Sequence, residues 1–162
     1  MKTHAYNKIE PMAEADFSRA LPFVREIIAA GETYALPRDM TDKDIQAYFF
    51  RPGHTVFRAE NADGAVVGVY YLRANQEGGG GHIANAGFMV DPAARGQGVA
   101  RAMAAHALQT AERQGFTGMQ FNFVVSTNAA AVHLWHALGF QTIGTIPKGF
   151  CHPSAGFVDA LI

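Results

Sequence analysis

One stretch decides the fold: Val90-Asp91-Pro92-Ala93-Ala94-Arg95-Gly96-Gln97-Gly98-Val99-Ala100. It joins the end of an apolar run, residues 83–90, to a long helical pattern through small residues. Helix N-termini bind anions because their first N–H groups have no intrahelical acceptor and the helix dipole is positive there. Glycines let a phosphate approach the backbone, and Arg95 and Arg101 add positive charge. The stretch predicts a strand, loop and helix that bind a diphosphate, although glycines at such a junction can also be purely structural.

Two other phosphate-binding motifs and one hydrolase motif fit less well. A dinucleotide-binding Rossmann motif would need a third glycine where this chain has Arg101, and an acidic residue at the end of a following strand. No G-x-x-x-x-G-K-[ST] sequence occurs, which excludes a P-loop. No G-x-S-x-G sequence occurs either, which disfavours an α/β-hydrolase.

Outward from this stretch, hydrophobic periodicity predicts alternating helices and strands. Towards the N-terminus we expect helices over residues 15–30 and from 42, an inter-helix loop at 32–40, a hairpin of strands 54–60 and 65–72, a flexible glycine loop at 78–81 and a strand at 83–90. Towards the C-terminus we expect a helix at 98–114, a strand at 119–125, a helix at 129–138 capped by Ser126-Thr127-Asn128, and strands at 140–146 and 157–161. The order predicts a mixed α/β fold in a single domain, residues 1–162, with parallel pairing at the strand-helix-strand crossovers.

Composition favours a soluble, cytoplasmic protein. The 162 residues carry 13 basic and 14 acidic side chains for a net charge of -1, without blocks of like charge, so neither nucleic acid nor membrane is an expected partner. The N-terminal residues lack the apolar stretch of a signal peptide, and no run is long enough to span a bilayer. A single cysteine, Cys151, excludes an internal disulfide framework and fits a reducing compartment.

Two motifs together resemble the GNAT superfamily of N-acetyltransferases. Residues 95–100 match its [QR]-x-x-G-x-[GA] signature, and Asn128, Ala131, Leu134 and Leu138-Gly139-Phe140 match a second signature at the usual distance. The resemblance is strong over residues 54–146. It implies a fold of about seven strands and about four helices, in which strands 83–90 and 119–125 splay apart to admit acetyl-CoA as cosubstrate.

The resemblance also implies the residues that contact acetyl-CoA. Backbone groups of Phe88 and Val90 would pair with the pantetheine arm, and Asn128 would contact the cosubstrate, although a helix N-cap is an equally good role for it. The pyrophosphate would be wrapped by Arg95, Gly96, Gln97, Gly98, Val99, Ala100 and Arg101. A homodimer is common in the family, but no residue specifies one here.

The expected chemistry is direct acetyl transfer to the amine of a small molecule, without a covalent enzyme intermediate. Trp135 stands where the family often has a tyrosine acid; it cannot supply the proton, so we expect it to pack against the cosubstrate. His136 lies about 100° away around the helix and is a weak substitute. A thiol with a pKa of about 8.5 can leave unaided.

Two asparagines take the place of the expected carboxylate base. Asn85 and Asn122 each interrupt an apolar strand, where asparagine is disfavoured. We hypothesise that both orient the substrate and the reacting carbonyl as catalytic residues, with water taking the proton. The alternative is that each only satisfies local backbone groups.

The acceptor is expected to be an amino acid or its analogue. The asparagine-bearing strands look similar to a GNAT subgroup that acetylates proline analogues such as azetidine-2-carboxylate. Glu32, Thr33 and Tyr34 in the inter-helix loop could line the substrate pocket, or be merely exposed. Acetylation of protein N-termini or lysines, and a non-catalytic acyl-CoA sensor, are the alternative functions.

Metal and thiol chemistry have weaker support. His133 and His136 could share a helix face, but no further ligand cluster completes a metal site, so no metal is expected. Cys151 and His152 are adjacent in sequence, which does not make a catalytic dyad, and Pro153 favours a loop there.

Overall fold

A computed structural model describes residues 8–162, and these form two compact units. The first unit contains residues 8–26 and 41–120, and the second contains residues 27–40 and 121–162. The predicted phosphate-binding stretch lies in the first unit.

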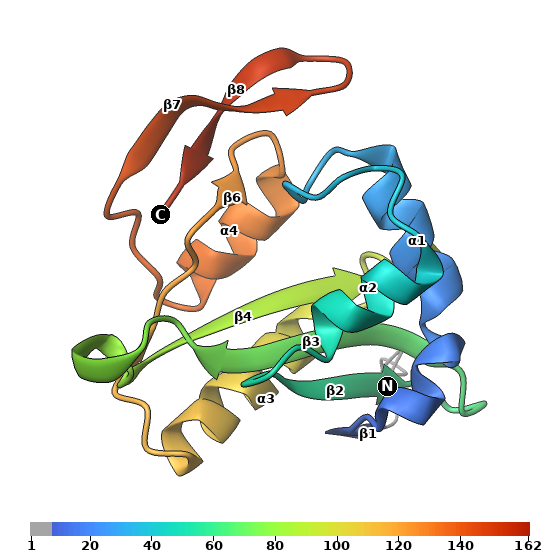
Figure 1. Cartoon of the computed structure of the whole chain (residues 1–162). Helices are drawn as coiled ribbons and strands as arrows, with labels where there is room; N and C mark the ends of the chain where they lie inside the picture. The colour runs from blue at the N-terminus through green and yellow to red at the C-terminus, as the bar shows by residue number, and fades with distance from the viewer. Residues whose placement is uncertain (1–7) are drawn as a thin grey trace. The chain divides into compact units, whose positions relative to one another are not determined.

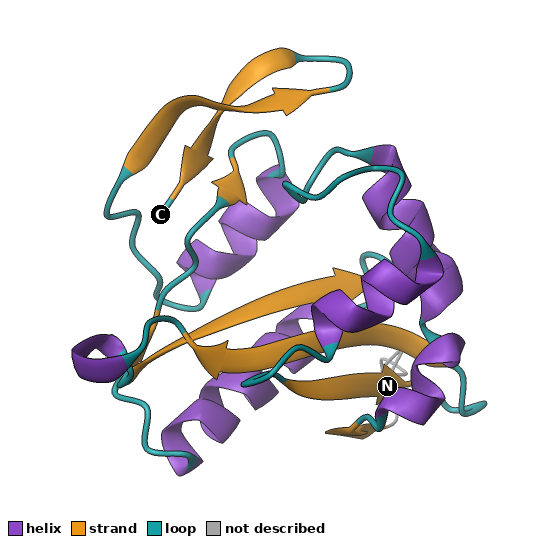
Figure 2. Ribbon diagram, viewed as in Figure 1, coloured by secondary structure: helices purple, strands orange, loops and turns teal. Residues whose placement is uncertain are grey.

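The first unit is built on a five-stranded mixed sheet (Figure 2). Its order is β1 (Lys8–Pro11), β2 (Thr55–Glu60), β3 (Val66–Ala74), β4 (Ile83–Val90) and β5 (Gly118–Met119). All neighbours are antiparallel except β4 and β5, which are parallel across the crossover helix. The predicted hairpin and the parallel crossover are confirmed, whereas β1 was not predicted.

Helices cover both faces of this sheet (Figure 1). Strand residues alternate between faces, so the neighbours Tyr70 and Tyr71 point in opposite directions. Tyr70 meets His106 of α3 (Val99–Arg113), and Tyr71 meets Tyr48 of α2 (Asp42–Phe49). A Cβ on Gly68 would lie 2.8 Å from Met103, so α3 packs closely because β3 has a glycine there.

The predicted helix at residues 15–30 is two elements, a 3-10 helix η1 (Glu14–Arg19) and α1 (Leu21–Ala30). Pro22 explains the break, because proline fits the first turn of a helix but not its interior. The predicted start of α2 is confirmed: Thr41 and Asp44 form a reciprocal capping box.

The predicted strand at 119–125 is wrong as one element, because β5 ends at Met119 and β6 (Val124–Val125) starts after a gap. Gln120 N still donates to Ala84 O at 2.9 Å. In a continuing parallel ladder, the Gln120 carbonyl would accept the next hydrogen bond from a backbone amide of β4. Here it accepts from the side-chain Nδ2 of Asn85 instead, at 2.9 Å. The Asn85 side chain thus ends the β4–β5 ladder, although the largely apolar run at residues 119–125 predicts one continuous strand.

The second unit contains a three-stranded antiparallel sheet and a helix. Its strand order is β6, β8 (Gly156–Leu161) and β7 (Thr145–His152), and α4 spans Ala129–Ala137. Since β6 and β7 both run antiparallel to β8, they are parallel to each other across α4, with β8 between them.

The predicted strand at 140–146 is displaced, because β7 begins only at Thr145 and continues to His152. Pro147 and Gly149 are typical of the end of a strand. In β7 they lie inside the strand, at a register shift between Ile146 and Phe150 where Lys148 has φ 53°. Cys151 and His152 therefore lie in a strand, not in the predicted loop.

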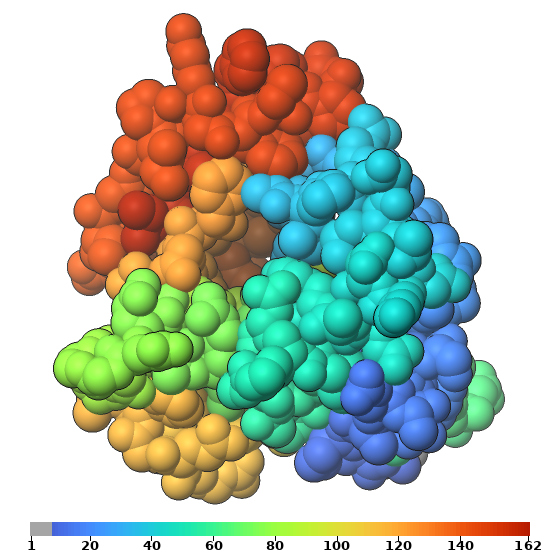
Figure 3. All heavy atoms as spheres, in the orientation of Figure 1, coloured from blue at the N-terminus to red at the C-terminus, as the bar shows by residue number. Residues whose placement is uncertain are grey.

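The predicted glycine loop is a 3-10 turn, η2 (Gly78–Gly80), at the surface of the molecule (Figure 3, lime). None of the helices within residues 8–162 has both the length and the apolar character that crossing a bilayer would require.

Candidate active site

The loop between β4 and α3 has the geometry of an anion-binding turn. Asp91 Oδ1 accepts from Ala93 N at 2.9 Å and caps one 3-10 turn, η3 (Pro92–Ala94). Gly96 and Gly98 then adopt φ of 74° and 85°, a conformation that favours glycine. The position of a Cβ on either glycine is open space, so the backbone here is accessible to a ligand.

The first turn of α3 supplies the donors. The first α-helical bond runs from Ala102 N to Gly98 O at 3.0 Å, so the amides of Val99, Ala100 and Arg101 precede it and have no helical acceptor. This first turn contains no acidic residue. Arg95 and Arg101 are exposed at the same place. Open glycines, amides and two cations fit a diphosphate such as that of acetyl-CoA.

Strand β4 leads directly into this turn. Phe88 and Val90 pair with Tyr70 and Gly68 of β3 on one edge. On the other edge the ladder with β5 pairs only Ile83 and Ala84, so it ends before Phe88. The Phe88 ring stacks on Tyr70, with centroids 5.2 Å apart, on the face that α3 covers.

Asn85 lies on the opposite face of β4 and is 5% exposed. Its Nδ2 donates to Gln120 O, as described above. The cross-strand neighbour of Asn85 is Arg73, and that of Gly87 is Tyr71. The side chains of Asn85, Arg73 and Tyr71 therefore share one face of the sheet.

An aromatic group that the sequence did not predict lies on that face. Tyr48 and Tyr71 share a hydrogen bond, with their hydroxyl oxygens 3.1 Å apart. The His54 ring stacks on the Tyr71 ring, with ring centroids 4.3 Å apart. Burial raises the pKa of the Tyr48 hydroxyl and lowers that of His54 to about 4. Strict alternation along residues 66–74 is the sequence signal that places Tyr71 and Arg73 on one face of the strand.

The second unit contains the remaining predicted site residues. Asn128 Oδ1 accepts from Ala131 N at 3.4 Å, so the N-cap expected at the start of α4 is present. Trp135 packs against Phe121 and Phe140, with ring centroids 4.4 and 5.9 Å away. Asn122 is half-buried in the bend between β5 and β6.

The predicted substrate-binding loop also lies in the second unit. Glu32 is exposed, and Thr33 and Tyr34 are half-buried, in the irregular segment that follows α1. Arg38 Nε donates to Ala29 O at 2.7 Å and folds this loop back on the helix. The structure thus groups Asn85, Phe88, Val90 and residues 95–101 in one unit, and the other candidates in the second.

The described part of the chain contains no group of three or more His, Cys, Asp or Glu side chains able to hold a metal ion. Cys151 is exposed, and His152 Nδ1 accepts from the amides of Ser154 and Ala155, each at 3.2 Å. Neighbouring strand residues point to opposite faces, so the two side chains do not form a dyad.

Comparison with known proteins identifies relatives over most of the chain. Residues 21–140 match the model of the "Acetyltransferase (GNAT) family". The chain is 30% identical over 176 residues to the N-acetyltransferase aca1 of Schizosaccharomyces pombe, which covers 99% of this chain and 82% of that protein. It is also 30% identical over 122 residues to the N-acetylaspartate synthetase of Rattus norvegicus, covering 75% of this chain but 39% of that protein.

Solved structures share the fold. A GCN5-related N-acetyltransferase from Kribbella flavida is 43% identical with a TM-score of 0.90, over 95% of this chain and 94% of that one. A phosphinothricin acetyltransferase from Sinorhizobium meliloti, solved with acetyl-CoA, has a TM-score of 0.81 over 95% of this chain and 84% of that one. At 18% identity, the second likeness concerns the fold.

Proposed function

The chain belongs to the GNAT family of acetyltransferases, and from that premise we propose that it transfers the acetyl group of acetyl-CoA to the amine of a free amino acid or amino-acid analogue. The observation that carries the proposal is the turn between β4 and α3, where open glycines precede three amides without helical acceptors. Such a turn binds a diphosphate without a metal-binding side chain.

Named residues of the chain would hold acetyl-CoA, which supplies an activated acyl group when bound. The amides at the start of α3, with Arg95 and Arg101, would hold the diphosphate. The backbone of Phe88 and Val90 would align the pantetheine arm, because the β5 ladder ends before them. Asn128 and Trp135 would contribute contacts from the second unit.

Direct transfer to the amine would rely on Asn85 and Asn122. Since Asn85 Nδ2 donates to Gln120 O, its Oδ1 would be the atom that accepts an N–H of the substrate amine. Asn122 would donate to the reacting carbonyl, and water would take the released proton. Loss of the family's tyrosine would be tolerated because a thiolate can leave without a proton.

An amino-acid acceptor is supported by one relative, which is named for the synthesis of N-acetylaspartate. Likeness to a subgroup that acetylates proline analogues points in the same direction, towards a small acceptor that Glu32, Thr33 and Tyr34 would help to enclose.

We further propose one domain over residues 1–162 and a cytoplasmic homodimer.

Calorimetry with acetyl-CoA tests the cosubstrate site. We expect Arg95→Gln and Arg101→Gln each to weaken binding about tenfold, the effect of about 1.4 kcal/mol. Arg113→Gln, at the other end of the same helix, is the matched control and should bind normally. Equal affinities in all three variants would remove the diphosphate assignment.

Thiol release from acetyl-CoA tests the reaction. Free amino acids should support turnover better than peptides, and Asn85→Ala and Asn122→Ala should lower kcat/KM by at least tenfold each. Preference for peptides would favour a protein acetyltransferase. Binding of acetyl-CoA without turnover of any amine would favour an acyl-CoA sensor.

A further inference from the structure

A cluster of aromatic and cationic side chains lies on the face of β3 and β4 that α2 covers. The Tyr48 and Tyr71 hydroxyl oxygens are 3.1 Å apart, and the guanidinium of Arg51 lies 4.6 Å from the centre of the Tyr48 ring. His54 stacks on Tyr71 and its Nδ1 lies 3.0 Å from Phe49 O. The cluster is built entirely from residues of the first unit.

The cluster is adjacent to Asn85. A Cβ on Gly87 would lie 2.7 Å from the Tyr71 hydroxyl oxygen, so this hydroxyl lies directly over β4, two positions from Asn85. Arg73 is the cross-strand partner of Asn85 itself. A substrate that Asn85 orients would therefore lie on the same face of the sheet as Arg73 and Tyr71.

Arg73 has no carboxylate partner within residues 8–162. Its Nη1 donates to the carbonyls of Ala74 and Asn75 at 3.2 and 3.4 Å, and the side chain is half-buried. By contrast, Arg19, Arg25 and Arg58 each form an ion pair with an acidic residue. A half-buried guanidinium that lacks a counter-ion favours binding of an anion.

The groups around Arg73 add hydrogen-bond donors but no negative charge. The raised pKa of Tyr48 keeps its hydroxyl protonated at neutral pH, and the lowered pKa of His54 keeps that ring neutral. Arg73 lies two positions from Tyr71 on the same face of β3. One of the two tyrosine hydroxyls donates to the other, which leaves the second O–H free to donate. A cation and this hydroxyl pair match the needs of a carboxylate.

We infer that Arg73, with the hydroxyls of Tyr48 and Tyr71, binds the carboxylate of the acceptor. The substrate class is then an amino acid with a free carboxylate, and simple amines and amino-acid amides are poor acceptors. This inference rests on the proposed acetyl transfer to an amine. It assigns the discrimination to one side chain on β3, a strand that contributes none of the residues expected from the sequence.

The test compares acids with their amides. Thiol release from acetyl-CoA is measured with L-aspartate, L-proline and azetidine-2-carboxylate, and with the α-carboxamide of each. In the unchanged protein at least one acid should have a kcat/KM tenfold or more above that of its amide. Arg73→Gln should lower kcat/KM for that acid about tenfold, mainly through KM, and leave the amide unaffected. Arg73→Lys should restore part of the loss.

Two further variants keep the result interpretable. Tyr48→Phe removes one hydroxyl and should raise KM for the acid about threefold, which tests the site even if Arg73→Gln fails to fold. Arg113→Gln is an exposed control and should behave as the unchanged protein. Calorimetry with acetyl-CoA should give the same affinity for every variant, because none of the substituted residues belongs to the turn between β4 and α3.

The outcomes separate the two proposals. Equal turnover of acids and amides, or an acid preference that survives Arg73→Gln, would overturn the carboxylate site and leave the acetyltransferase proposal standing. Acetyl-CoA binding without turnover of any acid or amide would refute both.

Discussion

At the residue scale, Gly87 shows how one missing side chain sets the position of another. Its hypothetical Cβ would lie 2.6 Å from Cε1 of Tyr71, in the ring and not at a flexible end. We predict that Gly87→Ala displaces Tyr71, costs about 1–3 kcal/mol in unfolding free energy, and raises KM for an acidic acceptor. Thermal unfolding and thiol-release kinetics measure the two effects.

Gly79→Ala is the matched control for this substitution, since its Cβ would meet nothing within 4 Å. It should change neither quantity. If Gly87→Ala also changed neither stability nor KM, the Tyr71 ring would have room to move. The close approach of Tyr71 to Gly87 would then have no structural consequence.

Residue patterns predicted Asn85 but not its neighbours, for a physical reason. An asparagine in an apolar strand is conspicuous because its amide needs partners. Tyr71 and Arg73 are ordinary strand residues, and only the register with β4 places them beside Asn85 and Gly87. Register depends on long-range pairing, which the local sequence does not specify.

At the element scale, the start of α3 depends on glycines that adopt positive φ. Gly98→Ala keeps the space but forces an alanine to φ 85°, which costs about 1–2 kcal/mol. We predict a lower thermal midpoint and an acetyl-CoA affinity weakened several-fold, because the methyl group would lie where we propose that the diphosphate binds. Calorimetry and thermal unfolding give the two values.

Gly53→Ala separates strain from binding. Gly53 has φ 86° and an equally open Cβ position, but it lies in the turn after α2. The same loss of stability with unchanged acetyl-CoA affinity is expected. If Gly53→Ala weakened acetyl-CoA binding as much as Gly98→Ala, backbone strain would explain the lower affinity of Gly98→Ala. A contact between Gly98 and the diphosphate would then not be needed.

Elements with strong periodicity or caps were predicted well, and those decided by tertiary contacts were not. The helices α2, α3 and α4 and the strands β2, β3 and β4 occur within a few residues of the predicted bounds. The strand expected at 119–125 is interrupted because a side chain takes the Gln120 carbonyl. Strand β1 was missed because four residues ending in Pro11 carry almost no pattern.

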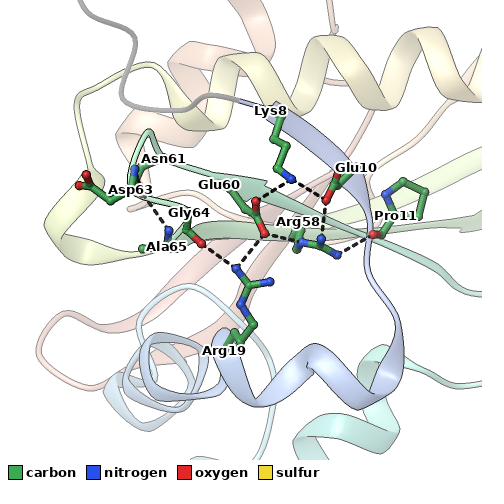
Figure 4. A network of polar contacts seen from close by, with 10 residues as sticks. All are labelled: Lys8, Glu10, Pro11, Arg19, Arg58, Glu60, Asn61, Asp63, Gly64 and Ala65. Atoms are coloured by element: carbon green, nitrogen blue, oxygen red, sulfur yellow. Dashed lines mark hydrogen bonds and ion pairs between the residues drawn. The ribbon is translucent and has the colours of Figure 1, made fainter.

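At the scale of the whole molecule, a network of ion pairs joins the edge strand β1 and the 3-10 helix η1 to β2 (Figure 4). Glu60, with a side chain 5% exposed, accepts from Arg58 and Arg19 at 2.8 Å each and pairs with Lys8 at 3.0 Å. Glu10 bridges Lys8 and Arg58. Three segments distant in sequence therefore depend on one carboxylate.

This carboxylate makes the stability of the molecule depend on pH. Hydrogen bonds from Arg58, then Lys8 and Arg19, lower the pKa of Glu60 from 4.5 to about 2. Because the folded pKa is below the unfolded one, the stabilisation is complete above pH 4.5 and disappears as pH falls towards 2. We predict that Glu60→Gln lowers the thermal midpoint by several degrees at pH 7. The difference in thermal midpoint between this variant and the unchanged protein should become smaller as the pH falls from 4.5 towards 2.

Thermal unfolding at steps from pH 7 to pH 2.5 measures this difference directly, since the other carboxylates titrate in both proteins and largely cancel. Glu77→Gln, which replaces an exposed carboxylate outside the network, is the control and should change the thermal midpoint little. A constant gap for Glu60→Gln would mean that the carboxylate contributes through its shape and hydrogen bonds alone, because a charged group with a lowered pKa must lose its advantage on protonation.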